Sequence, residues 1–283
     1  MQSYTSNITL IVFACEGREH LLPATIESLR KSCDYLFNPV ILAIDGDYSN
    51  EAITVVKPDL IVQNYDRKGY VQNIINALNL IETEFFFWLE DDWEFTKPVD
   101  LNYLLDLLRK NPDWVQIRLS KTAPLTNDEK AINLFDDIYG SIYGFSANPC
   151  VCRTELVKLG LKALQEAEKD KYTGFETFLS EWYAAQKLTC AVLDPKDSVP
   201  IIHSGYLEST PRQWHMTASL DEKTNEYLSP MGHIPEPSFL RRLLMFFRLL
   251  SASLSLSIRQ FWSRSSYDLS FRILSVIKES RKN

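Results

Sequence analysis

The feature that most constrains the fold is a run of five apolar residues, Phe85 to Leu89, which leads directly into Glu90, Asp91 and Asp92. An uninterrupted apolar run of this length is typical of a strand buried on both faces of a parallel sheet. Three adjacent carboxylates repel each other and are costly to bury unpaired. A cation would relieve that repulsion, and carboxylate oxygens are preferred ligands of Mg²⁺ and Mn²⁺. Because open α/β sheets bind ligands beyond the carboxyl ends of their strands, the pattern predicts a metal site that holds a phosphorylated substrate.

The charge of the chain is divided unevenly along its 283 residues. The formal net charge of −7 argues against a general nucleic-acid-binding protein, so we expect no nucleic-acid partner. Residues 1–235 hold 34 acidic and 21 basic residues, whereas residues 236–283 hold three acidic and nine basic residues. We therefore expect the body and the tail to have different partners.

The five cysteines have no regular spacing, which favours small buried thiols and a reducing compartment over a disulfide framework. Cys150 and Cys152 could form half of a metal site, but no second pair of Cys or His residues lies at a suitable spacing. The N-terminus lacks the basic region and cleavage site of a secretory signal. No uncharged apolar stretch reaches the roughly 18 residues that a membrane span requires. These features predict a cytoplasmic protein.

Segments typical of strands and helices alternate along the chain. In the first half we expect helices that begin near Pro23 and at Gly69, and strands at residues 8–14, 40–44, 60–62 and 85–89. In the second half we expect helices at residues 153–167 and 174–186, and strands at residues 115–119, 138–145 and 189–193. Residues 203–237 have no clear period and are expected to form a long loop. The alternation predicts an α/β fold with a mostly parallel central sheet.

Four features of the first half occur in a recognisable order. A polar turn, Cys15-Glu16-Gly17-Arg18, follows the first strand, and Asp45 ends the second strand. Lys68-Gly69-Tyr70-Val71-Gln72-Asn73 then opens a helix, and the acidic triplet closes the fourth strand. This order resembles the nucleotide-sugar-binding half of GT-A glycosyltransferases, especially the large inverting family two. In that family a Gly-x-x-x-Asn helix precedes a strand that ends in an Asp-x-Asp motif. The likeness covers residues 7–120 closely and residues 138–205 more loosely, with Glu90 in place of the first Asp.

The resemblance implies a GT-A nucleotide-binding sandwich and a role for each acidic residue. Asp45 matches the position that holds the nucleobase of the donor. Glu90 or Asp91 would face the ribose, and Asp92 would bind Mg²⁺ or Mn²⁺ at the diphosphate. Such a cation stabilises the charge that develops on a diphosphate leaving group.

Lys68 and Asn73 are further donor-binding candidates. An alternative role exists for each of the upstream candidates. Asp45 could be a turn residue, because Asp-Gly favours turns. Lys68 could be an exposed side chain, and Asn73 could be an ordinary residue of the first helical turn.

An inverting transfer also needs a base that removes the proton of the acceptor hydroxyl. Glu176, in Thr173-Gly174-Phe175-Glu176, resembles the region that supplies this base in family two. The same four residues fit a capping box, with Thr173 as N-cap and Glu176 at N3. Glu181 and Asp137 are reserve candidates for the base.

Two residues further along the chain complete the candidate site. His203 follows a short apolar run, where some GT-A enzymes carry a metal-binding histidine, although a lone histidine is more often structural. Arg212, in the expected lid loop at residues 203–235, could bind the donor diphosphate because a guanidinium matches phosphate geometry.

The tail has the pattern of an amphipathic helix at residues 239–262. Three arginines, Arg241, Arg248 and Arg259, fall on the side opposite a broad apolar face, which comprises Phe239, Leu243, Phe247, Leu250, Leu254, Ile258 and Phe261. A broad apolar face with basic residues opposite is typical of a helix that lies in a membrane interface. The alternative is a helix packed on the catalytic domain or on a second subunit.

Together these patterns predict a GT-A catalytic domain at residues 1–235 and a basic helical tail at residues 236–283. The domain would comprise a nucleotide-sugar-binding half (1–120), an acceptor half (121–202) and the lid loop (203–235). The expected function is transfer of a hexosyl or deoxyhexosyl group from a nucleotide-diphosphate donor to a glycan or lipid-linked acceptor at the cytoplasmic membrane face.

Two other functions remain open. A sugar-phosphate nucleotidyltransferase would share the scaffold, but it usually has a glycine-rich loop after the first strand, where this chain has Gly17 alone. A non-catalytic module could bind a nucleotide or glycan without turnover.

Overall fold

The computed structural model describes residues 8–120, 125, 127–167, 174–194 and 200–204. All of them belong to the unit that spans Met1–Leu228. The predicted tail at residues 236–283 and the predicted lid loop beyond Ser204 lie outside the described residues. The division into a catalytic domain and a tail therefore stays a prediction.

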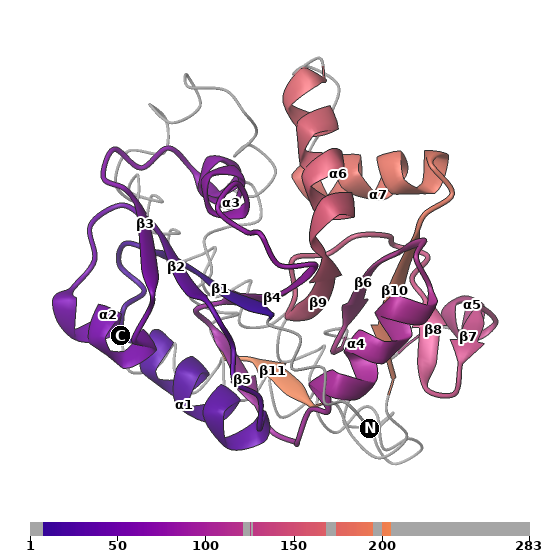
Figure 1. Ribbon diagram of the computed structural model, residues 1–283, viewed down its shortest axis with the longest axis horizontal. Helices are drawn as coiled ribbons and strands as arrows, with labels where there is room; N and C mark the ends of the chain where they lie inside the picture. Colours follow the sequence, from indigo (N-terminus) through magenta and orange to yellow (C-terminus); the bar gives the residue numbers. More distant parts are fainter. Residues whose placement is uncertain (1–7, 121–124, 126, 168–173, 195–199, 205–283) are drawn as a thin grey trace, which may run out of the picture. The chain divides into compact units, whose positions relative to one another are not determined.

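Nine of the eleven described strands form one sheet in the order β3-β2-β1-β4-β9-β6-β10-β8-β7 (Figure 1). They are β1 (Thr9–Cys15), β2 (Val40–Asp45), β3 (Leu60–Asn64), β4 (Phe85–Glu90), β6 (Trp114–Arg118), β7 (Asn133–Phe135), β8 (Ile138–Gly140), β9 (Cys150–Arg153) and β10 (Thr189–Leu193). Strands β3, β2, β1 and β4 are parallel neighbours, and β6 is parallel to β10. Strand β9 is antiparallel to β4 and β6, and β8 is antiparallel to β10 and β7. The α/β class is confirmed, and the sheet is mixed, with four parallel and four antiparallel pairs of neighbouring strands.

Strand β9 accounts for two of the four antiparallel pairs. It lies between β4 and β6 in the middle of the sheet, and Cys150, Val151 and Cys152 are fully buried. Four residues are too few to show a strand period in the sequence. The two cysteines are therefore core residues, with Sγ atoms 3.3 Å apart and no disulfide between them.

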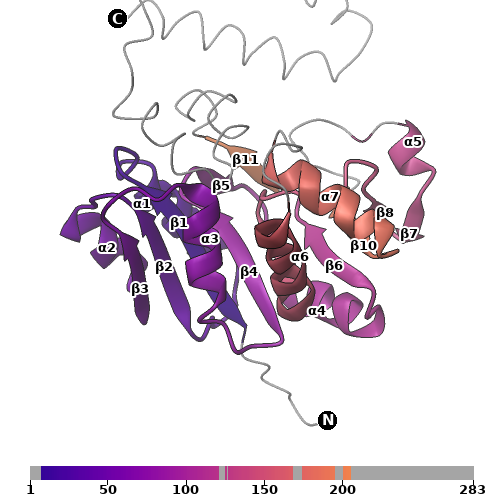
Figure 2. The same ribbon diagram turned by 90° about the horizontal axis from the view of Figure 1, so that it is seen from above.

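Helices cover both faces of the sheet (Figures 1 and 2). One apolar core lies under α1 (Leu22–Ser32), α2 (Asn50–Val56) and α4 (Leu101–Lys110), and the other lies under α3 (Tyr70–Leu78), α6 (Thr154–Glu166) and α7 (Phe175–Ala185). Right-handed crossovers explain the division. The chain moves from β1 to β3 in one direction along the sheet and returns in the other direction to β4, so α1 and α2 lie opposite α3. A short helix, α5 (Asn127–Lys130), precedes β7.

Two expectations for the second half are corrected by the structure. The strand expected at residues 138–145 ends at Gly140 because the chain then turns: Gly144, with φ of +69°, donates its N–H to the carbonyl of Ser141 at 3.1 Å. The N-cap of α7 is Gly174 rather than Thr173, which lies outside the described residues. The capping box is therefore not the arrangement found at this helix.

A second, two-stranded sheet returns the chain to the acidic triplet. Strand β5 (Trp93–Phe95) begins directly after Asp92 and pairs antiparallel with β11 (Ile201–His203), so that His203 lies opposite Trp93. This pairing places His203, near the end of the described residues, beside the carboxyl end of β4. Within the part of the chain that the structure describes, no helix is long and apolar enough to cross a membrane.

Candidate functional site

The carboxyl ends of β1, β2 and β4 meet at one edge of the sheet, where the strand order changes direction. The crossovers from β1 lead to β2 and β3 on one side, while β4 lies on the other side of β1. Such a switch point is where open α/β sheets bind ligands. Glu90 ends β4 at this point, and the loop that carries Arg18 follows β1 at the same point. The acidic triplet is therefore placed where the sequence predicted a ligand site.

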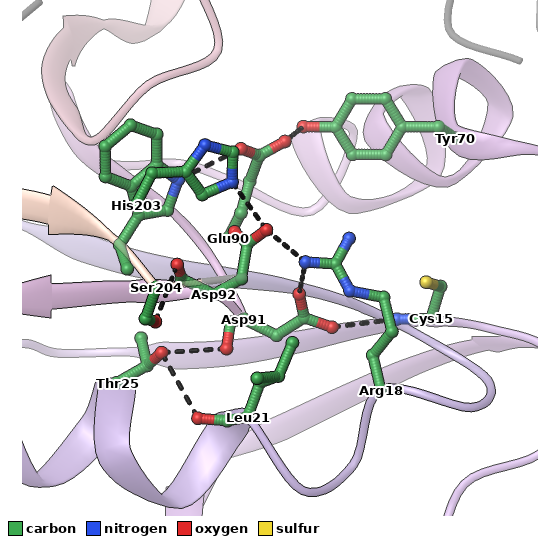
Figure 3. Close-up of polar contacts among 11 residues, drawn as sticks. Cys15, Arg18, Leu21, Thr25, Tyr70, Glu90, Asp91, Asp92, His203 and Ser204 are labelled. Atoms are coloured by element: carbon green, nitrogen blue, oxygen red, sulfur yellow. Dashed lines mark hydrogen bonds and ion pairs between the residues drawn. The ribbon is translucent and has the colours of Figure 1, made fainter. Parts of the chain in front are cut away.

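Asp91 is held by contacts from both neighbouring elements (Figure 3). Its Oδ1 atom lies 3.0 Å from Nη2 of Arg18, and its Oδ2 atom accepts a 3.3 Å hydrogen bond from the N–H of Cys15. The hydroxyl of Thr25, on α1, donates a 2.7 Å hydrogen bond to the Asp91 carbonyl. The carboxylate of Asp91 is thus buried and faces the loop after β1.

Asp92 joins the triplet to β11 and to the loop after β1. Its Oδ2 atom lies 2.6 Å from Nε2 of His203 and also forms an ion pair with Arg18 (Figure 3). Ser204 donates a 3.0 Å hydrogen bond to the Asp92 carbonyl. The other carboxylate oxygen, Oδ1, is buried and accepts no hydrogen bond from the described residues. A buried oxygen without a partner is costly, so this atom is a candidate ligand for a cation.

Glu90 lies on the other side of the triplet and is held by two aromatic residues. The hydroxyl of Tyr70, the first residue of α3, donates a 2.5 Å hydrogen bond to its Oε1 atom. The indole N–H of Trp93 donates a 3.2 Å hydrogen bond to Oε2. The Trp93 ring also stacks on the ring of His203, with centroids 4.4 Å apart and an interplanar angle of 7°. Trp93 therefore holds both Glu90 and the imidazole that contacts Asp92.

The three carboxyl groups differ in their affinity for a proton. Burial and the charge of Asp92 raise the pKa of Glu90 to about 7. Burial also raises the pKa of Asp91 to about 8, although the Arg18 charge opposes this. Burial would raise the pKa of Asp92 as well, but the hydrogen bond from His203 and the charge of Arg18 hold it below its usual value. Asp92 is therefore the ionised member of the triplet at neutral pH, and its neighbours retain much of their protonation.

Asp45 has a structural role at the start of α3. Its carboxylate is buried and accepts hydrogen bonds from the N–H of Gly69, at 3.1 Å and 3.2 Å to the two oxygens. Gly69 is the N-cap of α3 and has φ of +90°, a conformation that favours glycine. Burial raises the pKa of Asp45, while the N–H groups of Gly69 and Lys68 and the charge of Arg67 lower it. The structure thus places Asp45 at the predicted edge, in contact with the helix that carries Tyr70.

The other two candidates at the start of α3 differ in exposure. Asn73 is 1% exposed; its Oδ1 atom accepts a 3.3 Å hydrogen bond from Asn64, and its Nδ2 atom is buried without a partner among the described residues. Lys68 is exposed, as the alternative interpretation of this residue expects. Their donor-binding roles stay predictions.

Glu176 lies in the first turn of α7, close to the triplet through Tyr70. The preceding residue, Phe175, packs edge-on against the Tyr70 ring with centroids 5.7 Å apart. The Oε1 atom of Glu176 accepts a 2.6 Å hydrogen bond from the N–H of Ala147. A chain of contacts from Glu90 to Tyr70 to α7 therefore connects the predicted donor side with the predicted base.

The remaining candidates lie elsewhere. Glu181 is exposed on α7. Asp137 lies between β7 and β8, and β8 is separated from β4 by three strands, a distance of roughly 19 Å at the usual strand spacing. The geometry therefore favours Glu176 over Asp137 as a group that acts at the triplet. Arg212 lies outside the described residues.

The donor set at Asp92 and His203 is compatible with Mg²⁺ or Mn²⁺, although it does not form a complete metal site. Within the described ranges, no group of three or more His, Cys, Asp or Glu side chains is arranged to hold an ion. The unpartnered Oδ1 atom of Asp92 is a suitable ligand, and Nε2 of His203 would become one after giving up its hydrogen bond to Oδ2 of Asp92. Mg²⁺ commonly uses one or two carboxylates and takes its other ligands from water and substrate phosphates.

Three residues of the site were not identified from the sequence: Arg18, Tyr70 and Trp93. Each has a signal that could have located it. Arg18 follows the central strand β1, and the carboxyl ends of parallel neighbours share one edge. Tyr70 opens the helix that the Gly-x-x-x-Asn pattern marked, and Trp93 directly follows the triplet.

Comparison with known proteins gives no family assignment. No protein-family model matches this sequence, and no curated protein matches it. The functional conclusion therefore depends on the geometry of the site and on the resemblance of its motifs.

Proposed function

We propose that the protein is a GT-A glycosyltransferase that uses a nucleotide-diphosphate sugar and a divalent cation, Mg²⁺ or Mn²⁺. The observation that carries the proposal is the position of Asp92. It lies at the switch point of the sheet, hydrogen-bonded to His203 through one oxygen, while its other oxygen is buried without a partner among the described residues. This arrangement supports a site for a cation and a phosphorylated ligand.

The side chains around Asp92 support a division of roles. Asp92 and His203 would hold the cation, which when bound would stabilise the charge that develops on the leaving diphosphate. Glu90 or Asp91 would face the ribose of the donor. Asp45 would contact the nucleobase while it holds the start of α3 through Gly69.

Glu176 is the proposed base on the acceptor side. The hydrogen bond from Ala147 to Oε1 fixes the orientation of its carboxylate. The second oxygen, Oε2, would then accept the proton of the acceptor hydroxyl as the sugar is transferred. The inverting course and the choice of a glycan or lipid-linked acceptor come from the resemblance to family two.

Binding to the cytoplasmic face of a membrane is part of the proposal. It is supported by the amphipathic pattern at residues 239–262 and by nine basic residues against three acidic residues at 236–283. The acceptor would then be presented at the same surface.

A thermal-shift screen tests the proposed donor class. The protein is heated with UDP-, GDP-, dTDP- and CMP-sugars, each with and without Mn²⁺. A ligand that binds the folded state raises the melting temperature by mass action, so the true donor is identified by a shift that requires Mn²⁺. A shift with a nucleotide-diphosphate sugar supports the proposal. A response to none of these compounds, or to CMP-sugars alone, contradicts the diphosphate donor.

A further inference from the structure

Arg18 is placed between two of the three carboxylates. Its Nη2 atom lies 3.0 Å from Oδ1 of Asp91 and forms an ion pair with Oδ2 of Asp92 (Figure 3). The Arg18 side chain is 16% exposed, against 2% and 3% for the two carboxylates. One guanidinium group therefore contacts two buried carboxyl groups and is the resident cation beside the ionised Asp92.

This placement conflicts with the presence of a second cation. A divalent ion bound to Asp92 would lie close to the guanidinium, and the two positive charges would repel each other. His203 already contacts the same oxygen of Asp92 as Arg18 does. Arg18 and a divalent ion therefore compete for the charge of the triplet.

A bound diphosphate would remove the conflict. Guanidinium groups bind phosphate oxygens in a bidentate geometry, and a diphosphate supplies negative charge for both cations. Arg18 is also well placed to move, because it is a long side chain on a turn rather than on a strand or helix. The turn is formed by Gly17, which has φ of +88°, and by a 3.3 Å hydrogen bond from the Arg18 N–H to the Cys15 carbonyl.

We propose that Arg18 couples metal binding to donor binding. In the free protein it contacts Asp91, neutralises the charge of Asp92 and keeps the affinity for a free divalent ion low. When a nucleotide-diphosphate sugar brings its own charge, Arg18 releases Asp92 to the ion and binds the diphosphate. Arg18 is then a positioning residue that makes metal binding depend on the donor. The inference rests on the proposed function for the identity of the diphosphate ligand, but the competition with the ion can be measured without a donor.

The test is the affinity of the full chain for Mn²⁺ alone, measured by titration calorimetry on the wild type, Arg18→Met and Arg109→Met. Arg109 lies on α4, where it pairs with Asp106, and serves as a matched loss of charge away from the triplet. We expect Arg18→Met to bind Mn²⁺ at least about tenfold more tightly than the wild type and Arg109→Met to be unchanged. Addition of UDP or GDP is expected to tighten Mn²⁺ binding in the wild type and to have a smaller effect in Arg18→Met.

A second pair of variants keeps the test valid if Arg18→Met does not fold. Asp91→Asn replaces one of the two carboxyl groups that Arg18 contacts. When Arg18→Met is added to Asp91→Asn, Asp92 loses its guanidinium partner, but no second ionisable group is left unpaired beside it. The double variant is expected to bind Mn²⁺ more tightly than Asp91→Asn alone.

Equal or weaker Mn²⁺ binding on removal of Arg18 overturns the inference, even if the protein turns over a sugar nucleotide. Tighter binding, together with no turnover of any sugar nucleotide, supports the competition at Arg18 and contradicts the proposed transferase.

Discussion

The Nε2 atom of His203 lies 2.6 Å from Oδ2 of Asp92, although His203 and Asp92 are 111 positions apart in the sequence. The β5–β11 pairing brings them together, because it places His203 opposite Trp93. The pairing is local to the site because β5 begins at the residue after Asp92. The stacked Trp93 ring fixes the plane of the imidazole against the carboxylate. The backbone pairing and the aromatic contact thus position one histidine at the ionised member of the triplet.

Replacement of His203 is expected to weaken metal-dependent donor binding. His203→Ala removes the hydrogen bond that lowers the pKa of Asp92, so the carboxylate becomes a poorer ligand, and it also removes a candidate metal ligand. We expect the Mn²⁺-dependent thermal shift with the donor to fall by half or more, and the shift of a His20→Ala control to be retained, since His20 lies on the surface before α1. An undiminished shift in His203→Ala excludes the metal role.

Loss of the Tyr70 hydroxyl is expected to destabilise the fold. Tyr70→Phe keeps the ring contacts with Phe13 and Phe175 but removes the 2.5 Å hydrogen bond to Glu90. A buried hydrogen bond to an acidic group contributes about 1–3 kcal/mol to the free energy of unfolding. Denaturant unfolding should therefore show a loss of this size at unchanged m-value. An unchanged midpoint would mean that the hydroxyl does not stabilise Glu90.

The stability of the metal-free protein is expected to fall as pH rises. Burial raises the folded-state pKa of Glu90 to about 7 and that of Asp91 to about 8, whereas both groups ionise near pH 4 in the unfolded chain. A carboxyl with a raised folded pKa binds its proton more tightly in the folded state, so stability is lost as pH rises from about 4 through 8. Melting temperatures measured across this range should decline.

Asp91→Asn provides the control for this pH dependence, because the amide cannot ionise. We expect a shallower decline in this variant, and a shallower decline in the wild type with Mn²⁺ and donor present. A melting temperature that rises from pH 5 to pH 8 in the metal-free wild type contradicts the raised pKa values.

The two proposed roles of Asp45 can be separated by two substitutions. Asp45→Ala leaves the buried N–H of Gly69 without its acceptor and is expected to cost about 1–3 kcal/mol of unfolding free energy. Asp45→Asn keeps an acceptor oxygen, so we expect near-normal stability with weaker donor binding. Asp47→Ala, at an exposed position of the same turn, serves as the control and should change neither property. If Asp45→Asn binds the donor as well as the wild type, the nucleobase role is wrong.

The strands and helices in the first half of the fold could be predicted because their sequence signals are local. The apolar run at residues 85–89 is β4, and the helix expected to begin at Gly69 is α3, which buries Val71, Ile74, Ile75 and Leu78. Parallel neighbours bring their carboxyl ends to one edge, so Asp45 and the triplet could be expected to meet there. The antiparallel pairs within the sheet could not be predicted in this way, because β9 is short and its pairing with β4 is set by tertiary structure.

The contacts within the site could not be read from the sequence in the same way. The position of Arg18 after β1 locates it at this edge of the sheet, but its contact with Asp91 depends on the conformation of the turn, which its sequence neighbours do not indicate. The contact between His203 and Asp92 depends on a pairing across more than 100 residues, which no periodicity reports. The hydrogen bond from Ala147 to Glu176 likewise comes from the packing of a loop on α7.

The most direct test of the proposed function is donor hydrolysis by Asp92→Asn. The wild type is incubated with the sugar nucleotide selected by the thermal-shift screen, and release of nucleoside diphosphate is measured with and without Mn²⁺. Asp106→Asn, at an exposed position on α4, serves as the control. We predict Mn²⁺-dependent release in the wild type and the control, and a rate at least about 100-fold lower in Asp92→Asn. Unchanged release in Asp92→Asn would contradict the role of Asp92 as the metal ligand of a glycosyltransferase.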